Sequence, residues 1–202
     1  MTNENLIASA YFCRLSELLL QMQVTERQNS ECSELTIDEG AKKAVQLILS
    51  TKTESAKMML IGNGGSAAIV SHMQNDFCDS VGMRALVFNE APFLTAASND
   101  RGYETFFEQA IKLWADEQDL LIAVSSSGRS RNILRAVNAA VEKGCWIITF
   151  SGFLPDNPLR QLGHLNFYVS SEKYGFVETA HATLGHFLTD SAIASLVKVK
   201  IR

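Results

Sequence analysis

The sequence predicts a three-layer αβα sandwich with a five-stranded parallel sheet, preceded by two helices. From residue 57 onward, short apolar segments alternate with segments whose apolar residues recur at helical spacing. The short segments are apolar on both faces, as expected for parallel strands that helices cover on either side. Only three prolines occur, and no low-complexity segment divides the 202 residues, so one domain is expected.

The individual elements follow from these patterns. Two leading helices are expected, one over 3–28 and one from Thr36 or Asp38 to about residue 49, with a polar loop at 29–35. The strands are expected at 58–61, 85–88, 119–124, 146–150 and 166–169. Further helices are expected at 67–79, 105–114, 132–143 and 177–197. Residues 1–53 then form a helical extension that packs in an oligomer, and residues 54–202 form the αβα core.

Composition excludes several classes of function. The formal net charge of −4 gives no general attraction to nucleic acid or to an anionic membrane, so neither is expected as a partner. No segment has the length and apolar character of a membrane span, and the segment around Glu4 lacks the basic residues of an export signal. The cysteines match no zinc or disulfide pattern, which indicates reduced thiols and a cytoplasmic location. They are Cys13, Cys32, Cys78 and Cys145.

Residues 62–66, Gly-Asn-Gly-Gly-Ser, form a glycine turn between the first predicted strand and its helix. Glycines permit positive φ angles and let backbone N–H groups approach an anion, while the following helix N-terminus adds partial positive charge. A tight turn with no ligand is an equally good explanation of this segment alone. The turn matches neither the dinucleotide nor the Walker pattern, which argues against a nucleotide.

Residues 125–130, Ser-Ser-Ser-Gly-Arg-Ser, form a serine loop after the third predicted strand. Each hydroxyl can donate a hydrogen bond to a phosphate oxygen, together with the N–H groups of the loop. A helix N-cap needs one serine, and this loop has four. The serine loop therefore favours phosphate binding, and Arg129 is a further candidate for charge or a solvated side chain.

The glycine turn followed by the serine loop resembles the sugar isomerase (SIS) domain, most fully its phosphoheptose isomerase branch. The resemblance covers nearly the whole chain and implies a single SIS domain with the flavodoxin-like SIS fold, assembled as a homotetramer. By position, it implies phosphate binding by the serine loop, substrate contacts in the glycine turn and a substrate-binding pair after the second strand. These residues are Ser125, Ser126, Ser127 and Ser130, then Asn63, Gly64, Gly65 and Ser66, and last Asn99 and Asp100.

The same resemblance implies a metal and catalytic set for Zn²⁺ or another divalent metal. By position it falls on His72, Asp76, Glu178 and His186, with the last three as catalytic residues. Two residues depart from the family pattern, because Asp76 replaces a glutamate and Glu178 replaces a glutamine, so either is a candidate base. Glu178 and His186 are eight residues apart, about 12 Å along a straight helix. Either another subunit completes the site, or Glu178 precedes the helix.

The implied activity is conversion of sedoheptulose 7-phosphate to D-glycero-D-manno-heptose 7-phosphate through an enediol, for lipopolysaccharide or capsule synthesis. A carboxylate base and a histidine acid–base suit this chemistry, and a metal can stabilise the developing oxyanion. One alternative is an isomerase for a phosphosugar of another length. Another is a non-catalytic SIS regulator that binds a phosphosugar or a replication initiator. A regulator would not need the metal-competent side chains, so their presence favours the enzyme.

Overall fold

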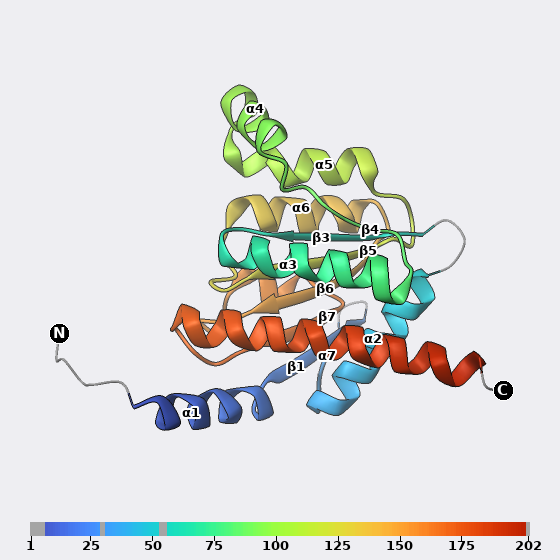
Figure 1. The fold of residues 1–202 in the computed structure, drawn as a ribbon. Coiled ribbons are helices and arrows are strands. Elements are labelled where there is room, and N and C mark those ends of the chain that lie inside the picture. Colours follow the sequence, from blue (N-terminus) through green and yellow to red (C-terminus); the bar gives the residue numbers. More distant parts are fainter. Residues whose placement is uncertain (1–6, 29–30, 53–55, 201–202) are drawn as a thin grey trace, which may run out of the picture.

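The computed structural model describes residues 7–28, 31–52 and 56–200, which form one sheet between two layers of helices (Figure 1). Within these residues the sheet has seven strands in the order β2-β1-β7-β6-β5-β3-β4. They are β1 (Gln23–Gln28), β2 (Glu31–Leu35), β3 (Met58–Gly62), β4 (Ala85–Val87), β5 (Leu120–Ser125), β6 (Trp146–Ser151) and β7 (Leu165–Tyr168). The strands from β7 to β4 are parallel, which confirms the predicted parallel sheet. Strands β1 and β2 add an antiparallel hairpin beside β7.

Each central strand is buried on both faces because its alternate residues point into different helix layers. In β3, Met58 and Leu60 pack into the layer of α2, α3 and α7, whereas Met59 and Ile61 pack into the layer of α4, α5 and α6. The helices are α1 (Ala8–Leu20), α2 (Ile37–Thr51), α3 (Gly65–Asp76), α4 (Ala91–Arg101), α5 (Phe106–Trp114), α6 (Arg131–Glu142) and α7 (Tyr174–Lys200). The three-layer αβα sandwich is therefore confirmed. Among the described residues, no helix is both long and apolar enough to cross a bilayer.

The N-terminal segment differs from the prediction. The helix expected over 3–28 ends at Leu20, residues 23–28 form β1, and the expected loop at 29–35 contains β2; residues 3–6 and 29–30 lie outside the described range. The reason is tertiary, because β1 pairs with β7 along its length and buries Val24. Such a partner, distant in sequence, overrides a weak local helical pattern.

The second difference is α4, which the sequence did not predict. Its apolar residues lack a regular helical stripe, and only Ala97 is buried among them. Pro92 in its first turn sets φ for a helix start. The helix places the expected substrate pair, Asn99 and Asp100, on an exposed segment.

Candidate active site

A cleft of about 290 Å³ opens where the glycine turn and the serine loop meet. Strands β3 and β5 are parallel neighbours with Gly62 opposite Val124, so the two segments that follow them lie side by side. In chain order the parallel strands have the arrangement 2-1-3-4-5, and β3 and β5 flank the point where this order reverses, the usual ligand position in such sheets. The cleft is lined by Asn63, Gly64, Gly65, Ser66, Ser125, Ser126, Ser127, Ser130, Tyr174 and Glu178.

Glycine is required in the glycine turn for specific steric reasons. Gly64 has φ of 54° and ψ of −121°, which side-chain-bearing residues rarely adopt. A Cβ atom at Gly62 would lie 2.7 Å from the backbone of Ser66, and one at Gly65 would lie 2.4 Å from the carboxylate of Glu178. Gly65 and Ser66, which begin α3, line the cleft, and no side chain caps the N–H groups of this helix start.

The serine loop also ends in an uncapped helix. Ser130 is the N-cap residue of α6, yet its hydroxyl accepts no capping hydrogen bond. By contrast, α2 has a complete capping box between Thr36 and Glu39. Ser126 lines the cleft, and its buried hydroxyl has no hydrogen-bond partner among the described residues.

A buried donor without a partner is costly, and the first N–H groups of α3 and α6 are not satisfied by an N-cap side chain, so this part of the cleft has hydrogen-bond donors that suit an anion. Arg129, in contrast, is exposed and pairs with Asp156 at 3.2 Å, so it does not line the cleft.

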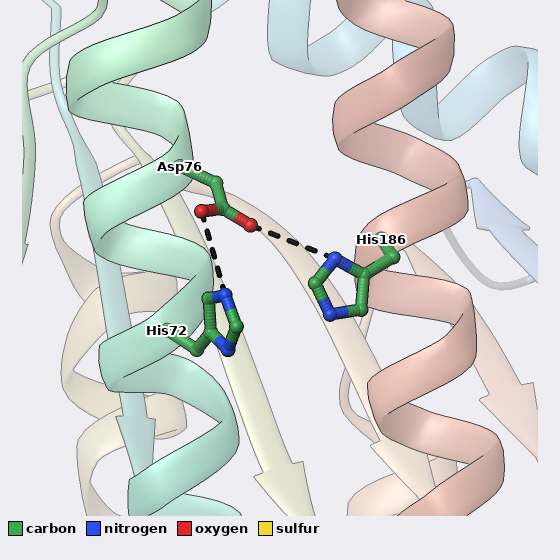
Figure 2. A group of neighbouring side chains, drawn as sticks. All are labelled: His72, Asp76 and His186. Atoms are coloured by element: carbon green, nitrogen blue, oxygen red, sulfur yellow. Dashed lines mark ion pairs between the residues drawn. The ribbon is translucent and has the colours of Figure 1, made fainter.

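A second group of site residues lies between α3 and α7, which run side by side (Figure 1). His72 and Asp76 project from α3 and His186 from α7, as Figure 2 shows. His72 Nε2 lies 3.6 Å from Asp76 Oδ1, and His186 Nδ1 lies 3.6 Å from Asp76 Oδ2. We call these three residues the histidine cluster.

The histidine cluster has donor atoms suited to a divalent metal. Its three ligand atoms lie within 4.8 Å of one another. Tetrahedral Zn²⁺ with bonds of about 2.1 Å holds its ligand atoms about 3.4 Å apart. Each imidazole has a nitrogen 3.6 Å from an oxygen of Asp76. Two imidazoles and one carboxylate leave a fourth position open, as catalytic zinc sites do.

The remaining sequence-predicted residues lie elsewhere. Glu178 lines the cleft rather than the histidine cluster, so the structure brings together three members of the implied metal set and places the fourth beside Gly65. Asn99 and Asp100 hydrogen-bond to each other on α4 and do not line the cleft.

Sequence reasoning missed Tyr174 and Asn132. Tyr174 begins α7 and lines the cleft one helical turn before Glu178, so its position relative to that residue was a usable signal. Asn132 is bonded to Asn63 across the two loops, and no local sequence pattern indicates that pairing.

Comparison with known proteins agrees with this arrangement. Residues 20–152 match the model of the SIS domain family. Over 153 residues the chain is 33% identical to a phosphoheptose isomerase from Burkholderia pseudomallei, covering 73% of this chain and 77% of that protein. It is 30% identical over 155 residues to a phosphoheptose isomerase from Thermodesulfovibrio yellowstonii, covering 74% and 77%.

A solved structure shows the same fold. The phosphoheptose isomerase from Neisseria gonorrhoeae superposes with a TM-score of 0.77 at 23% identity, covering 92% of this chain and 96% of that one. The chain therefore belongs to the SIS-domain family and, within it, to the isomerases of the phosphoheptose isomerase branch.

Proposed function

We propose that the protein interconverts a phosphorylated ketose and aldose, with sedoheptulose 7-phosphate and D-glycero-D-manno-heptose 7-phosphate as the pair. The observation that supports this most is the meeting of two helix N-termini, those of α3 and α6, at a cleft lined by four serines of the serine loop. Neither helix is capped by the side chain of its N-cap residue. Backbone N–H groups and hydroxyls in that arrangement suit a phosphate dianion. The relatives named phosphoheptose isomerase support the choice of a heptose.

The distance between the cleft and the histidine cluster supports a substrate with a long carbon chain. On α3, Gly65 lines the cleft and His72 follows seven residues later, about 10 Å along the helix axis. Helical side chains tilt toward the N-terminus, which brings the carboxylate of Asp76 back toward the turn of His72. A seven-carbon chain extended from a phosphate in the cleft has the length to place C1 and C2 at the histidine cluster.

In this pose, the cluster carries out the proton transfers. Asp76 removes a proton from C1 of the ketose, which gives an enediol, and His186 moves a proton between the oxygens on C1 and C2. Return of the proton to C2 from the same carboxylate gives the aldose. Glu178, beside the phosphate end, accepts hydrogen bonds from sugar hydroxyls.

The cluster also fits a divalent metal such as Zn²⁺, which His72, Asp76 and His186 would hold. When bound, the metal would supply Lewis-acid stabilisation of negative charge on the sugar oxygens. Its requirement is checked by removing metal with a chelator and adding back Zn²⁺ or Mn²⁺. We expect activity to fall and to recover with one of these ions.

The direct test mixes the purified protein with sedoheptulose 7-phosphate and follows the appearance of aldose by NMR. We expect turnover, and slower turnover of fructose 6-phosphate, whose shorter chain reaches the cluster less well. Binding of the heptose phosphate without turnover, in the presence and absence of Zn²⁺, would favour a regulatory phosphosugar-binding protein instead. An active enzyme of this type would supply heptose for lipopolysaccharide or capsule from the cytoplasm.

A further inference from the structure

Asn132 and Asn63 form a reciprocal amide pair between the two loops of the cleft. Asn63 Nδ2 donates to Asn132 Oδ1 at 2.9 Å, and Asn132 Nδ2 donates to Asn63 Oδ1 at 2.8 Å. Asn63 lies in the glycine turn, and Asn132 lies in the first turn of α6, directly after the serine loop. The pair therefore connects the segment after β3 to the segment after β5.

The pair uses most of the hydrogen-bonding capacity of the Asn63 side chain. Its oxygen also accepts a hydrogen bond from the hydroxyl of Tyr103 at 2.7 Å. An amide has two acceptor positions on oxygen and two donor hydrogens on nitrogen, so only one donor is left. Asn63 thus contributes to the cleft mainly through its backbone and the conformation of the glycine turn, rather than by a substrate-binding side chain.

Asn132 has a second effect, on the start of α6. Its Oδ1 accepts from the backbone N–H of Ile133 at 3.0 Å, the third residue of the helix. That N–H is one that an N-cap serine hydroxyl ordinarily satisfies. Because Asn132 satisfies it, the hydroxyl of Ser130 is not needed as a cap. Ser130 lines the cleft, where its hydroxyl accepts a hydrogen bond from that of Ser125 at 3.4 Å.

We infer that Asn132 is a positioning residue for phosphate binding, which holds the glycine turn in register with the serine loop and frees Ser130. Asn132 is only 2% exposed and does not line the cleft, so it acts through Asn63 and Ser130 rather than on the ligand. The inference rests on the proposed phosphate-binding function of the cleft.

The test measures binding of inorganic phosphate and of sedoheptulose 7-phosphate by calorimetry, together with kcat, KM and the melting temperature. For Asn132→Ala we expect Kd and KM to rise about tenfold, as for the loss of several hydrogen bonds, with kcat within about twofold of wild type. The control Asn138→Ala, an exposed asparagine on the same helix, leaves all four values unchanged. A fall in melting temperature with unchanged KM would show a purely structural role and overturn the inference.

A double-mutant cycle tests whether Asn63 and Asn132 affect phosphate binding as a pair or independently. Because Asn63 and Asn132 act as a unit, Asn63→Ala/Asn132→Ala should bind phosphate no more weakly than the worse single variant. Tyr103→Phe removes only an exposed hydroxyl, so it folds even if Asn132→Ala does not, and we expect a rise in Kd of about threefold. Unchanged Kd in Tyr103→Phe, or additive effects in the cycle, would contradict the inference. If the wild-type protein bound neither inorganic phosphate nor sedoheptulose 7-phosphate, the proposed function itself would be refuted.

Discussion

At the scale of single residues, the two carboxylates of the site have different surroundings. Asp76 lies 3.6 Å from the nearest nitrogen of each imidazole, whereas Glu178 lies against Gly65 in the cleft. We therefore expect Asp76→Asn to lower kcat by about 10²-fold or more, as for loss of a general base. Glu178→Gln should mainly change KM. Steady-state kinetics on sedoheptulose 7-phosphate decide this, and the reverse pattern would make Glu178 the base.

The histidines offer a matched comparison. We expect His186→Ala to lower kcat by about 10²-fold, the usual contribution of a positioned acid–base group. His164 lies before β7 and accepts a hydrogen bond from the backbone N–H of Ile147, outside both the cleft and the cluster. His164→Ala should therefore keep the wild-type kcat and KM. Equal activity of the two variants would remove His186 from the catalytic residues.

Gly128 permits the serine loop to turn back on itself. Its φ is 61°, and a Cβ atom there would lie 2.0 Å from Oδ1 of the buried Asn157. Gly128→Ala should therefore displace the loop and weaken phosphate binding by about tenfold or more, with about 1–3 kcal/mol lost from the free energy of unfolding. Gly144 is the control, because its φ is 75° but it follows α6 away from the cleft. Gly144→Ala should lose stability without a change in phosphate Kd, which calorimetry measures.

The sequence predicted those cleft-lining residues whose position follows from a strand-to-helix turn. The serine loop and the glycine turn are of this kind, because hydroxyls and glycines at such a turn have few structural alternatives. Asn132 is different, since its effect depends on Asn63, 69 residues away. A pairing across that separation leaves no periodicity or local motif in the sequence.

At the scale of elements, α7 is anchored to the sheet by a buried histidine. His181 is fully buried and its Nε2 donates to the backbone oxygen of Ser151 at 3.2 Å. Burial lowers the pKa of His181 from 6.5 to about 4, partly opposed by this hydrogen bond. The unfolded chain binds this proton more readily, so stability is fully present above about pH 6.5 and falls as the pH drops toward 4.

The pH effect is measurable with a variant that does not titrate. Between pH 7 and pH 5 the His181 contribution lowers the free energy of unfolding by about 2 kcal/mol. His181→Gln retains an N–H donor and removes the titration. Urea unfolding at both pH values should therefore show wild type losing about 2 kcal/mol more than the variant. Equal losses in the two proteins would mean that His181 is not the responsible group.

Element prediction failed where packing, rather than local pattern, decided the structure. Residues 23–28 have one strongly apolar side chain, Val24, and their conformation follows from pairing with β2 and β7. The edge strand β2 is polar and mostly exposed, which is typical of an edge that avoids further pairing but is easily mistaken for a loop. The buried parallel strands were predicted because continuous apolar segments such as 120–124 have no other suitable environment.

At the scale of the whole molecule, the cleft and the histidine cluster were predicted from different kinds of information. Alternation of strands and helices predicts that turns after neighbouring parallel strands converge at one edge, and the adjacency of β3 and β5 explains the cleft. The approach of α7 to α3 is different, because helix packing around a sheet depends on tertiary contacts. The histidine cluster was therefore expected from the family resemblance, not from the residue pattern alone.

At the same scale, α1 presents exposed apolar side chains on the surface of the subunit. This helix contacts α7 through Tyr11, whose ring stacks on Phe176 at 4.3 Å, while Phe12 and Leu20 are 65% and 76% exposed. Burial of one such side chain contributes about 1.5–3 kcal/mol, so an assembly that covers α1 is favoured. We expect a homotetramer, as the family resemblance implies, measured by analytical ultracentrifugation at micromolar concentration.

A charge on α1 tests whether that surface forms the interface. Phe12→Asp should dissociate the expected tetramer without unfolding the subunit, because an exposed side chain adds little to the core. Leu113 on α5 is 77% exposed in the opposite helix layer, so Leu113→Asp should remain tetrameric. A tetrameric Phe12→Asp would place the interface elsewhere, and a monomeric wild type would exclude a shared site. If Phe12→Asp dissociates and loses turnover while still binding phosphate, the cleft is complete in one subunit and the histidine cluster depends on the assembly.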